Sequence, residues 1–292
     1  MRRDTLRASF GPVLRLGRFL GHVLRRFQTD RCLPAAATLS YTSLFACVPL
    51  VAIVLSVLSA FPLFDDLQDE IERAIFLYLA PHVSDEAQAY FRAFLANTRQ
   101  LTALGVGGLG VSAIILLLTV EEEFNVIWRT RRGRRLRFRL LAYIGALLLG
   151  PLLVGGALSL STALYALVAL TGIPGLAGPA ARLTPFGLTA AGFALIYLAL
   201  PNRRVRPGDA LAGALVAAVL FELLKSGFGL YVRLFPAYQT IYGALSVVPI
   251  FLVWMYLAWA AVLFGAEITA GWPEWRAATR AAVGPDRPLV GA

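Results

Sequence analysis

Residues 207–235, PGDALAGALVAAVLFELLKSGFGLYVRLF, form an apolar segment long enough to cross a membrane as one helix, because a spanning helix needs roughly 20 mostly apolar residues. Beyond Asp209 near its start, the charged residues Glu222, Lys225 and Arg233 interrupt it. Residues three and four positions apart share a helix face, so these charges lie on one side of the predicted helix. A charge near the bilayer centre costs roughly 2.5–3.5 kcal/mol on insertion scales. We therefore expect this face to point into a helix bundle or a water-filled cavity.

The composition of the whole chain agrees with a membrane protein that has several spans. Of its 292 residues, 58% are hydrophobic, and the mean hydropathy is +0.70, whereas soluble domains are about 45–50% apolar. The two cysteines, Cys32 and Cys47, would lie about 22 Å apart along one helix, so no disulfide is expected. The first 34 residues hold eight arginines and no uninterrupted apolar core, which argues against a cleavable signal peptide.

The other apolar segments complete the prediction of an all-α polytopic membrane bundle with six transmembrane helices in residues 35–271. The six predicted spans lie at residues 35–64, 101–120, 140–170, 184–200, 207–235 and 243–270. Residues 65–100 are polar, carry two amphipathic patterns, and predict a helical hairpin outside the membrane. Residues 171–183 are predicted as a loop rich in glycine and proline, and residues 272–292 as a disordered cytoplasmic tail.

The N-terminal residues 1–34 predict a basic amphipathic helix on the cytoplasmic side. An apolar stripe that includes Leu20, Leu24 and Phe27 runs along one side, and five arginines lie on the other. Such a helix can lie on the membrane surface, where apolar burial and anionic lipid hold it. The same apolar face can instead dock on the protein's own bundle. The sequence leaves both arrangements open.

The placement of the arginines predicts the orientation of the spans. The N-terminal 34 residues, the loops after the second and fourth spans, and the tail together hold 21 arginines, whereas the three other loops hold 4. The positive-inside rule then places both termini in the cytoplasm, with the protein in a bacterial cytoplasmic membrane. Topology thus explains the excess of basic residues, and no nucleic acid is expected as a partner.

Glu222 is the leading candidate for a functional charge, because it lies near the middle of the fifth span and so near mid-membrane. A glutamate there could exchange protons, bind a cation, or pair with Lys225 or Arg233. The alternative is an internally neutralised ion pair that fixes helix packing. The small residues at positions 210, 213, 214, 217 and 218 favour tight packing of the first half of this helix.

Three further residues are candidates for lining a polar cavity. Ser40 and Tyr41 lie early in the first span, where hydroxyl groups either line a substrate path or form hydrogen bonds between helices. Glu267 lies near the cytoplasmic end of the sixth span, and we expect it to pair with an arginine near the same end. Its candidate partners are the arginines that follow Trp128, and Arg203, Arg204 and Arg206.

No enzyme active site can be assembled from the sequence. Metal-dependent hydrolases need clustered His, Asp, Glu or Cys ligands, and the two histidines, His22 and His82, are predicted on opposite sides of the membrane. The chain contains neither a phosphate-cradling GxxxxGK loop nor an HExxH motif. We therefore expect no catalytic activity, no cofactor and no bound metal.

Several short motifs follow one another between about residues 36 and 271. They are Ala37-x-Leu39-Ser40-Tyr41, Ser43-Leu44-Phe45 with Pro49, Asn125-x-Ile127-Trp128, Pro207-Gly208-Asp209-Ala210, Phe221-Glu222-Leu223, Ile241-Tyr242-Gly243-Ala244, Trp254-Met255-Tyr256 and Phe264-Gly265-Ala266-Glu267. In their order and spacing the chain resembles the YihY/BrkB family of bacterial inner-membrane proteins, once also labelled ribonuclease BN. The resemblance implies a six-span helical protein and brings no established biochemical activity. The absence of metal-ligand motifs argues against the nuclease label.

The leading functional hypothesis is a protein that moves an ion, a small solute or a lipid across the membrane through a polar cavity. Glu222 is its key charge, and membrane lipids are its expected partners. The alternative is a non-transporting envelope scaffold, for which the hairpin at 65–100 and the N-terminal helix matter more than Glu222. A membrane ribonuclease is not expected.

Overall fold

The computed structural model describes residues 2–58, 103–130, 143, 177–234 and 247–283, and every secondary-structure element in these ranges is an α-helix. The helices are α1 (Arg2–Thr29), α2 (Cys32–Leu58), α5 (Ala103–Ile127), α7 (Ala177–Ala199), α8 (Pro207–Leu234) and α10 (Val247–Val283). The predicted all-α class is thereby confirmed. Within the described ranges, two stretches are long and apolar enough to cross a membrane, Pro207–Tyr231 and Val248–Thr279.

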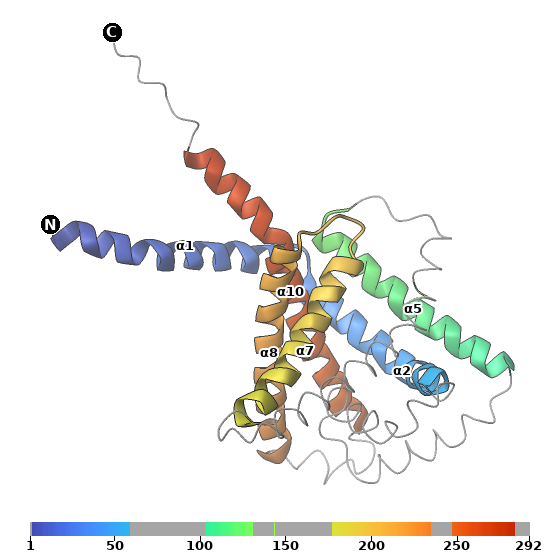
Figure 1. Ribbon diagram of the computed structural model, residues 1–292. Helices are drawn as coiled ribbons and strands as arrows, with labels where there is room; N and C mark the ends of the chain where they lie inside the picture. The colour runs from blue at the N-terminus through green and yellow to red at the C-terminus, as the bar shows by residue number, and fades with distance from the viewer. Residues whose placement is uncertain (1, 59–102, 131–142, 144–176, 235–246, 284–292) are drawn as a thin grey trace.

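The helix α10 forms the centre of the bundle. The helices α8, α2 and α1 pack against it, α7 packs on α8, and α5 packs on α2. Figure 1 shows α1 and the last turns of α10 leaving the bundle at the end where α8 begins. Because α1 and α10 come from opposite ends of the chain, this end of the bundle joins residues that are far apart in sequence.

Three helices lie close to predicted spans. The helix α8 ends one residue before the predicted segment 207–235 does, and α2 begins three residues before its predicted start at 35. The helix α5 continues seven residues beyond its predicted end at 120. Phe124 and Ile127 in this extension are buried in the core, which gives the additional turns of α5 a packing partner.

The predicted loop at 171–183 is wrong from Ala177 onwards, because α7 begins there. Pro179 lies in the first turn of α7, where the N–H that proline lacks would have no partner within the helix. Pro185 lies further inside the same helix. Proline in the sequence therefore marked the beginning of a helix rather than a loop.

The predicted disordered tail is wrong for residues 272–283, which continue α10. Trp272 and Trp275 pack edge-on against Phe19 of α1, with ring centroids 4.7 and 5.4 Å away. The same contact docks the second half of α1 on the bundle, through Phe19 and Val23, whereas Leu20 and Leu24 of the predicted apolar stripe are exposed. The predicted hairpin at 65–100, the third span at 140–170 except Tyr143, and the tail from 284 lie outside the described residues.

The helices α8 and α10 cross closely where both carry small residues. Ala210 and Ala217 of α8 are fully buried. A Cβ atom added at Gly213 would collide with the hydroxyl of Thr269 and with the carbonyl oxygen of Gly265, both on α10. Because small residues let helix backbones approach closely, the predicted tight packing of the first half of α8 is confirmed.

Two helices end at an arginine in the left-handed backbone conformation. Arg31 follows α1 with a φ of 53°, and Arg129 follows α5 with a φ of 52°. Their N–H groups donate to the carbonyl oxygens of Gln28 and Val126, at 3.2 and 2.9 Å. Glycine is the usual residue in such helix caps, because it has no Cβ to restrict φ. Each arginine therefore occupies its cap at a small conformational cost.

Candidate functional site

The guanidinium of Arg26 is the centre of a buried polar cluster where α1, α2, α5 and α10 meet. Its Nε donates to Glu267 Oε2 at 2.8 Å, and one terminal nitrogen donates to the carbonyl oxygen of Ile127 at 2.8 Å. The other terminal nitrogen donates to Glu274. The side chain of Arg26 is 3% exposed, and that of Glu267 is 0% exposed. One arginine thus connects α1 to both α5 and α10.

The electrostatics of this cluster keep Arg26 charged. Burial alone lowers the pKa of Arg26, but the hydrogen bonds and charges of Glu267 and Glu274 outweigh burial and raise the pKa above its ordinary value. Asp30 places one more carboxylate oxygen 3.8 Å from the guanidinium. Loss of one partner from a buried ion pair leaves an uncompensated charge and costs about 3–5 kcal/mol. The cluster therefore fixes α1 to the bundle.

The prediction that Arg203, Arg204 or Arg206 pairs with Glu267 is wrong, whereas the predicted arginines from 131 to 139 lie outside the described residues. Within the described part of the chain, Arg26 of α1 forms its ion pair, and no arginine of the 202–206 loop does so. The Cys32 thiol donates to the other carboxylate oxygen, Oε1, over 3.5 Å. Glu267 is thus enclosed between α1, α2 and α10, and a direct role for it in transport stays a prediction.

The hydroxyl residues predicted on the first span lie in different environments. Ser40 is buried and donates to a backbone carbonyl of its own helix at 2.8 Å. Ser43 accepts a hydrogen bond from Trp259 Nε1 at 2.9 Å and thereby joins α2 to α10. Tyr41 is exposed on α2, where its ring packs against Phe45. A role of Ser40 and Tyr41 in a substrate path stays a prediction.

Two further polar contacts join the helices. Glu121 of α5 accepts a hydrogen bond from the Asn202 side chain at 2.8 Å and another from the hydroxyl of Tyr143. Asp209 in the first turn of α8 forms an ion pair with Arg276 of α10. The first contact ties α5 to the connection before α8, and the second ties α8 to α10. Together with the Arg26 cluster they couple α1, α5, α8 and α10 through buried or half-buried charges.

The predicted charges on α8 form a local pair. The Nζ of Lys225 donates to Glu222 Oε1 at 2.6 Å, from three residues along the same helix. The side chain of Lys225 is 17% exposed and that of Glu222 is 39% exposed. The ammonium group also lies 5.7 Å from the centre of the Phe221 ring. The structure thus brings Glu222 and Lys225 together, and the side chain of Arg233 lies outside its described part.

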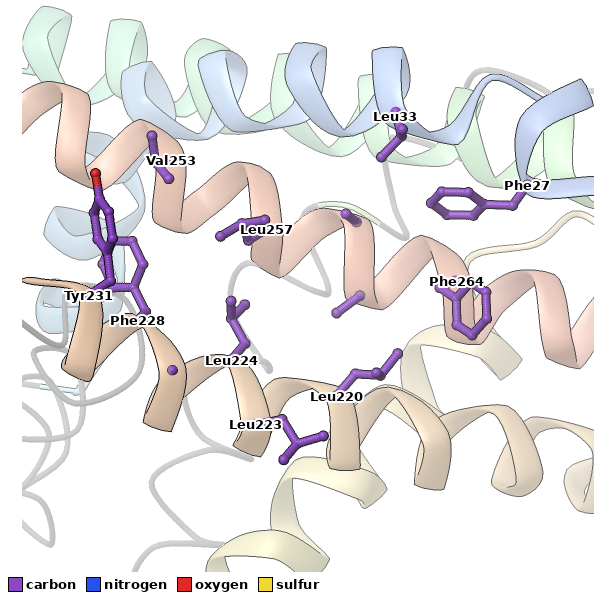
Figure 2. A pocket seen from close by; sticks show the side chains of 13 residues that line it. Phe27, Leu33, Leu220, Leu223, Leu224, Phe228, Tyr231, Val253, Leu257 and Phe264 are labelled. Atoms are coloured by element: carbon purple, nitrogen blue, oxygen red, sulfur yellow. The ribbon is translucent and has the colours of Figure 1, made fainter. Parts of the chain in front are cut away.

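An open groove with a volume of about 860 Å³ runs along α10 between α8 and the junction of α1 with α2. Among the described residues its lining is aliphatic or aromatic apart from the Tyr231 hydroxyl. These residues are Phe27, Leu33, Leu220, Leu223, Leu224, Gly227, Phe228, Tyr231, Val253, Leu257, Ala260, Ala261 and Phe264. Figure 2 shows Phe27 and Phe264 towards one end of the groove and Tyr231 towards the other.

The groove and the charged pair occupy different sides of α8. At 3.6 residues per turn, Glu222 points away from the side that carries Leu220 and Leu224, and these two leucines line the groove whereas Glu222 does not. The helix α8 therefore presents an apolar face to the groove and a charged face elsewhere. The predicted polar cavity is not the groove, whose lining is apolar.

In the described ranges, no group of three or more His, Cys, Asp or Glu side chains is placed to hold a metal ion. The closest approach to such a set is Glu267 with Cys32, and the guanidinium of Arg26 already occupies that carboxylate. The expectation that the protein holds no metal or cofactor stays a prediction.

The burial of Arg26 and the groove were not predicted from the sequence. A signal for Arg26 was present, because it lies three residues after Val23 and seven after Phe19, both of which are buried against the bundle. This spacing puts Arg26 on the apolar face of α1 rather than on the basic one. A charge on the docking face of a helix predicts a buried partner. The groove had no comparable signal, because its walls come from four helices.

Comparison with known proteins identifies relatives over most of the chain. The sequence pattern of the family described as virulence factor BrkB matches residues 23–288. A UPF0761 membrane protein of Rhodospirillum centenum is 47% identical over 275 residues, which cover 91% of this chain and 60% of the relative. One from Pseudomonas aeruginosa is 43% identical over 265 residues, covering 90% of this chain and 64% of the relative.

One relative matches this chain over most of its own length. The UPF0761 membrane protein of Aeromonas salmonicida is 40% identical over 257 residues, which cover 87% of this chain and 88% of the relative. The chain thus spans 60% and 64% of the length of the Rhodospirillum and Pseudomonas relatives and most of the Aeromonas protein. No solved structure matches the chain.

Proposed function

The chain belongs to the BrkB family of membrane proteins, and from this premise we propose that it moves phospholipid across the membrane in which it lies. The proposed topology has six spans in a bacterial cytoplasmic membrane, with both termini in the cytoplasm. Two apolar helices long enough to span and the uneven distribution of arginines support this topology. No enzymatic activity, cofactor or nucleic-acid partner forms part of the proposal.

The observation that carries the proposal is the groove on α10. Its aliphatic and aromatic lining can contact hydrocarbon but offers an ion or a polar solute almost no hydrogen-bonding group. A volume of about 860 Å³ lies in the range of sites that hold small organic ligands. Of the three classes of substrate expected from the sequence, a lipid therefore fits this groove best.

The charged face of α8 supplies the second part of the proposal. A lipid headgroup that crosses a bilayer needs a polar surface, because unpaired charge in hydrocarbon is costly. Glu222 and Lys225 form a half-exposed ion pair on the same helix that lines the groove. We assign the acyl chains to the groove and the headgroup route to the side of α8 that carries Glu222.

The experiment is lipid movement in proteoliposomes made with the full chain. A headgroup-labelled phospholipid is exposed to a membrane-impermeant reductant, and a panel of ions is tested in parallel vesicles. We expect wild type to expose inner-leaflet label to the reductant, and Glu222→Gln to abolish this while inserting normally. If lipid moves at the wild-type rate in Glu222→Gln, Glu222 has no role in lipid movement. If vesicles show ion flux but no lipid movement, the substrate is an ion and the lipid proposal is wrong.

A scaffold is the second candidate function, because the Arg26 cluster fixes α1 rigidly to α10. Both helices extend from the same end of the bundle (Figure 1) and offer a surface to partners there. If the protein acts as a scaffold, Arg26→Ala reduces partner recovery from crosslinked membranes, whereas Glu222→Gln leaves it unchanged. If Glu222→Gln reduces partner recovery and Arg26→Ala does not, the scaffold function is wrong.

A further inference from the structure

We propose that the groove on α10 is a binding site for an anionic phospholipid, with an acyl chain along α10 and the phosphate beside Arg31. This inference rests on the lipid-handling function proposed above and specifies the headgroup that the site selects. It combines an apolar groove of defined length with a cation at one end of it. Each of these features comes from a different part of the chain.

The length of the groove suits one leaflet of a bilayer. Its residues on α10 run from Val253 to Phe264, and those on α8 run from Leu220 to Tyr231. Eleven residues of α-helix rise about 16 Å. The hydrocarbon core of a bilayer is about 30 Å thick, so one leaflet contributes about 15 Å. An acyl chain that enters at the Phe27 end therefore fills the groove without crossing the bilayer midplane.

Arg31 lies where the groove meets the junction of α1 and α2. It follows Phe27 by one helical turn and precedes Leu33 by two residues, and both of these residues line the groove. Its side chain is exposed, and it forms no ion pair with any described residue. The neighbouring carboxylate of Asp30 is turned towards Arg26, at 3.8 Å. The guanidinium of Arg31 is thus the charge available to a phosphate at this end.

Arg31, like Arg129, has a left-handed backbone conformation. Its φ of 53° suits glycine better than a residue with a Cβ. Exposed Leu20 and Leu24 of α1 continue the apolar surface beyond Phe27, as expected of a helix that lies in the membrane interface. Phosphate groups lie at this depth and attract arginine.

The same backbone geometry provides a clean test. Arg31→Gly removes the charge and relieves the left-handed backbone, so the variant should fold at least as well as wild type. Arg129→Gly is the matched control, because Arg129 is also exposed and has a φ of 52° but follows α5, which does not line the groove. Gly227→Phe fills the groove, since a Cβ there meets no atom within 4 Å. Gly187→Phe on α7 is its control, with the same open surroundings.

The measurement is native mass spectrometry of the full chain released from nanodiscs that contain equal amounts of phosphatidylglycerol and phosphatidylethanolamine. We expect wild type and both controls to retain bound lipid enriched in phosphatidylglycerol. Arg31→Gly should retain lipid but lose about five-fold in the preference for the anionic headgroup, the size expected for one arginine near phosphate. Gly227→Phe should lose most of the bound lipid of both kinds.

Two results overturn the inference. One is an unchanged headgroup preference in Arg31→Gly, and the other is unchanged lipid retention in Gly227→Phe. The outcome is independent of lipid movement, because retention is measured without transport. If the protein retains anionic lipid selectively but moves no lipid, the binding site is supported and the proposed function is wrong.

Discussion

Two ion pairs of this protein differ in sequence separation and in burial. One joins α1 to α10, and the other lies on the neighbouring helix α8. The pair of Arg26 with Glu267 joins residues 241 apart in sequence and is almost completely buried. The pair of Glu222 with Lys225 joins residues three apart on α8, and the glutamate is 39% exposed. The surroundings differ as well, since the Ile127 carbonyl and the Cys32 thiol also contact the first pair, and an open groove lies on the other side of the helix that carries the second.

The difference separates charges that hold the fold from charges that contribute little to its stability. A buried pair with several hydrogen bonds has one arrangement, and the loss of one partner leaves the other charge buried without compensation. A half-exposed pair between adjacent turns contributes little to stability, because solvent screens it and either charge can rotate away. The Arg26 cluster is thus structural, we propose that the Glu222 pair acts in the function, and the following experiments test that division.

The largest expected effect is that of Glu267→Ala. It leaves Arg26 buried with only Glu274, Asp30 and the Ile127 carbonyl as partners, so the free energy of unfolding should fall by about 3 kcal/mol, the lower part of the range for a broken buried pair. Unfolding in mixed detergent with increasing dodecyl sulfate measures this. Glu274→Ala is the control, because Glu274 is 40% exposed and its loss should cost about 1 kcal/mol or less. Equal losses in the two variants contradict the assignment.

Packing along the two halves of α8 gives the next largest effect. Gly213→Ala places a methyl group against Thr269 and the Gly265 carbonyl and should cost about 1–3 kcal/mol. Gly227→Ala on the same helix faces the open groove and should be neutral or stabilise by up to about 1 kcal/mol, the gain in helix propensity. The same unfolding titration compares them. If both variants lose stability equally, α8 is not divided into a packed half and an open half.

The smallest effect on stability is expected for Glu222→Gln. An exposed pair contributes about 0.2–1 kcal/mol, so the free energy of unfolding should change by no more than about 1 kcal/mol. Lipid movement in the same preparation should nevertheless be lost, because the variant removes the charge assigned to the headgroup route. A loss of several kcal/mol would instead identify this pair as a second structural lock.

Local features of the structure followed from the sequence, and contacts between distant segments did not. The limits of α8 and its closely packed small residues could be predicted, because length, hydropathy and side-chain size act within one helix. The helical extension at 272–283 could not, because its aromatic contacts are with Phe19 at the other end of the chain. The sequence contains many arginines that could pair with Glu267. Only the packing of α1 on α10 shows that Arg26 does so.

The contact between Arg26 and Glu267 also has a consequence for how the protein is made. The two residues are separated by 241 positions, and at about 5–20 residues per second a ribosome needs about 12–48 s to produce that stretch. Throughout this interval α1 has left the ribosome, while the carboxylate that anchors it has not been synthesised. The helix α1 therefore reaches its final place only after α10 has been synthesised. A nascent chain that stops before α10 keeps an unanchored basic α1, which distinguishes unfinished chains from finished ones.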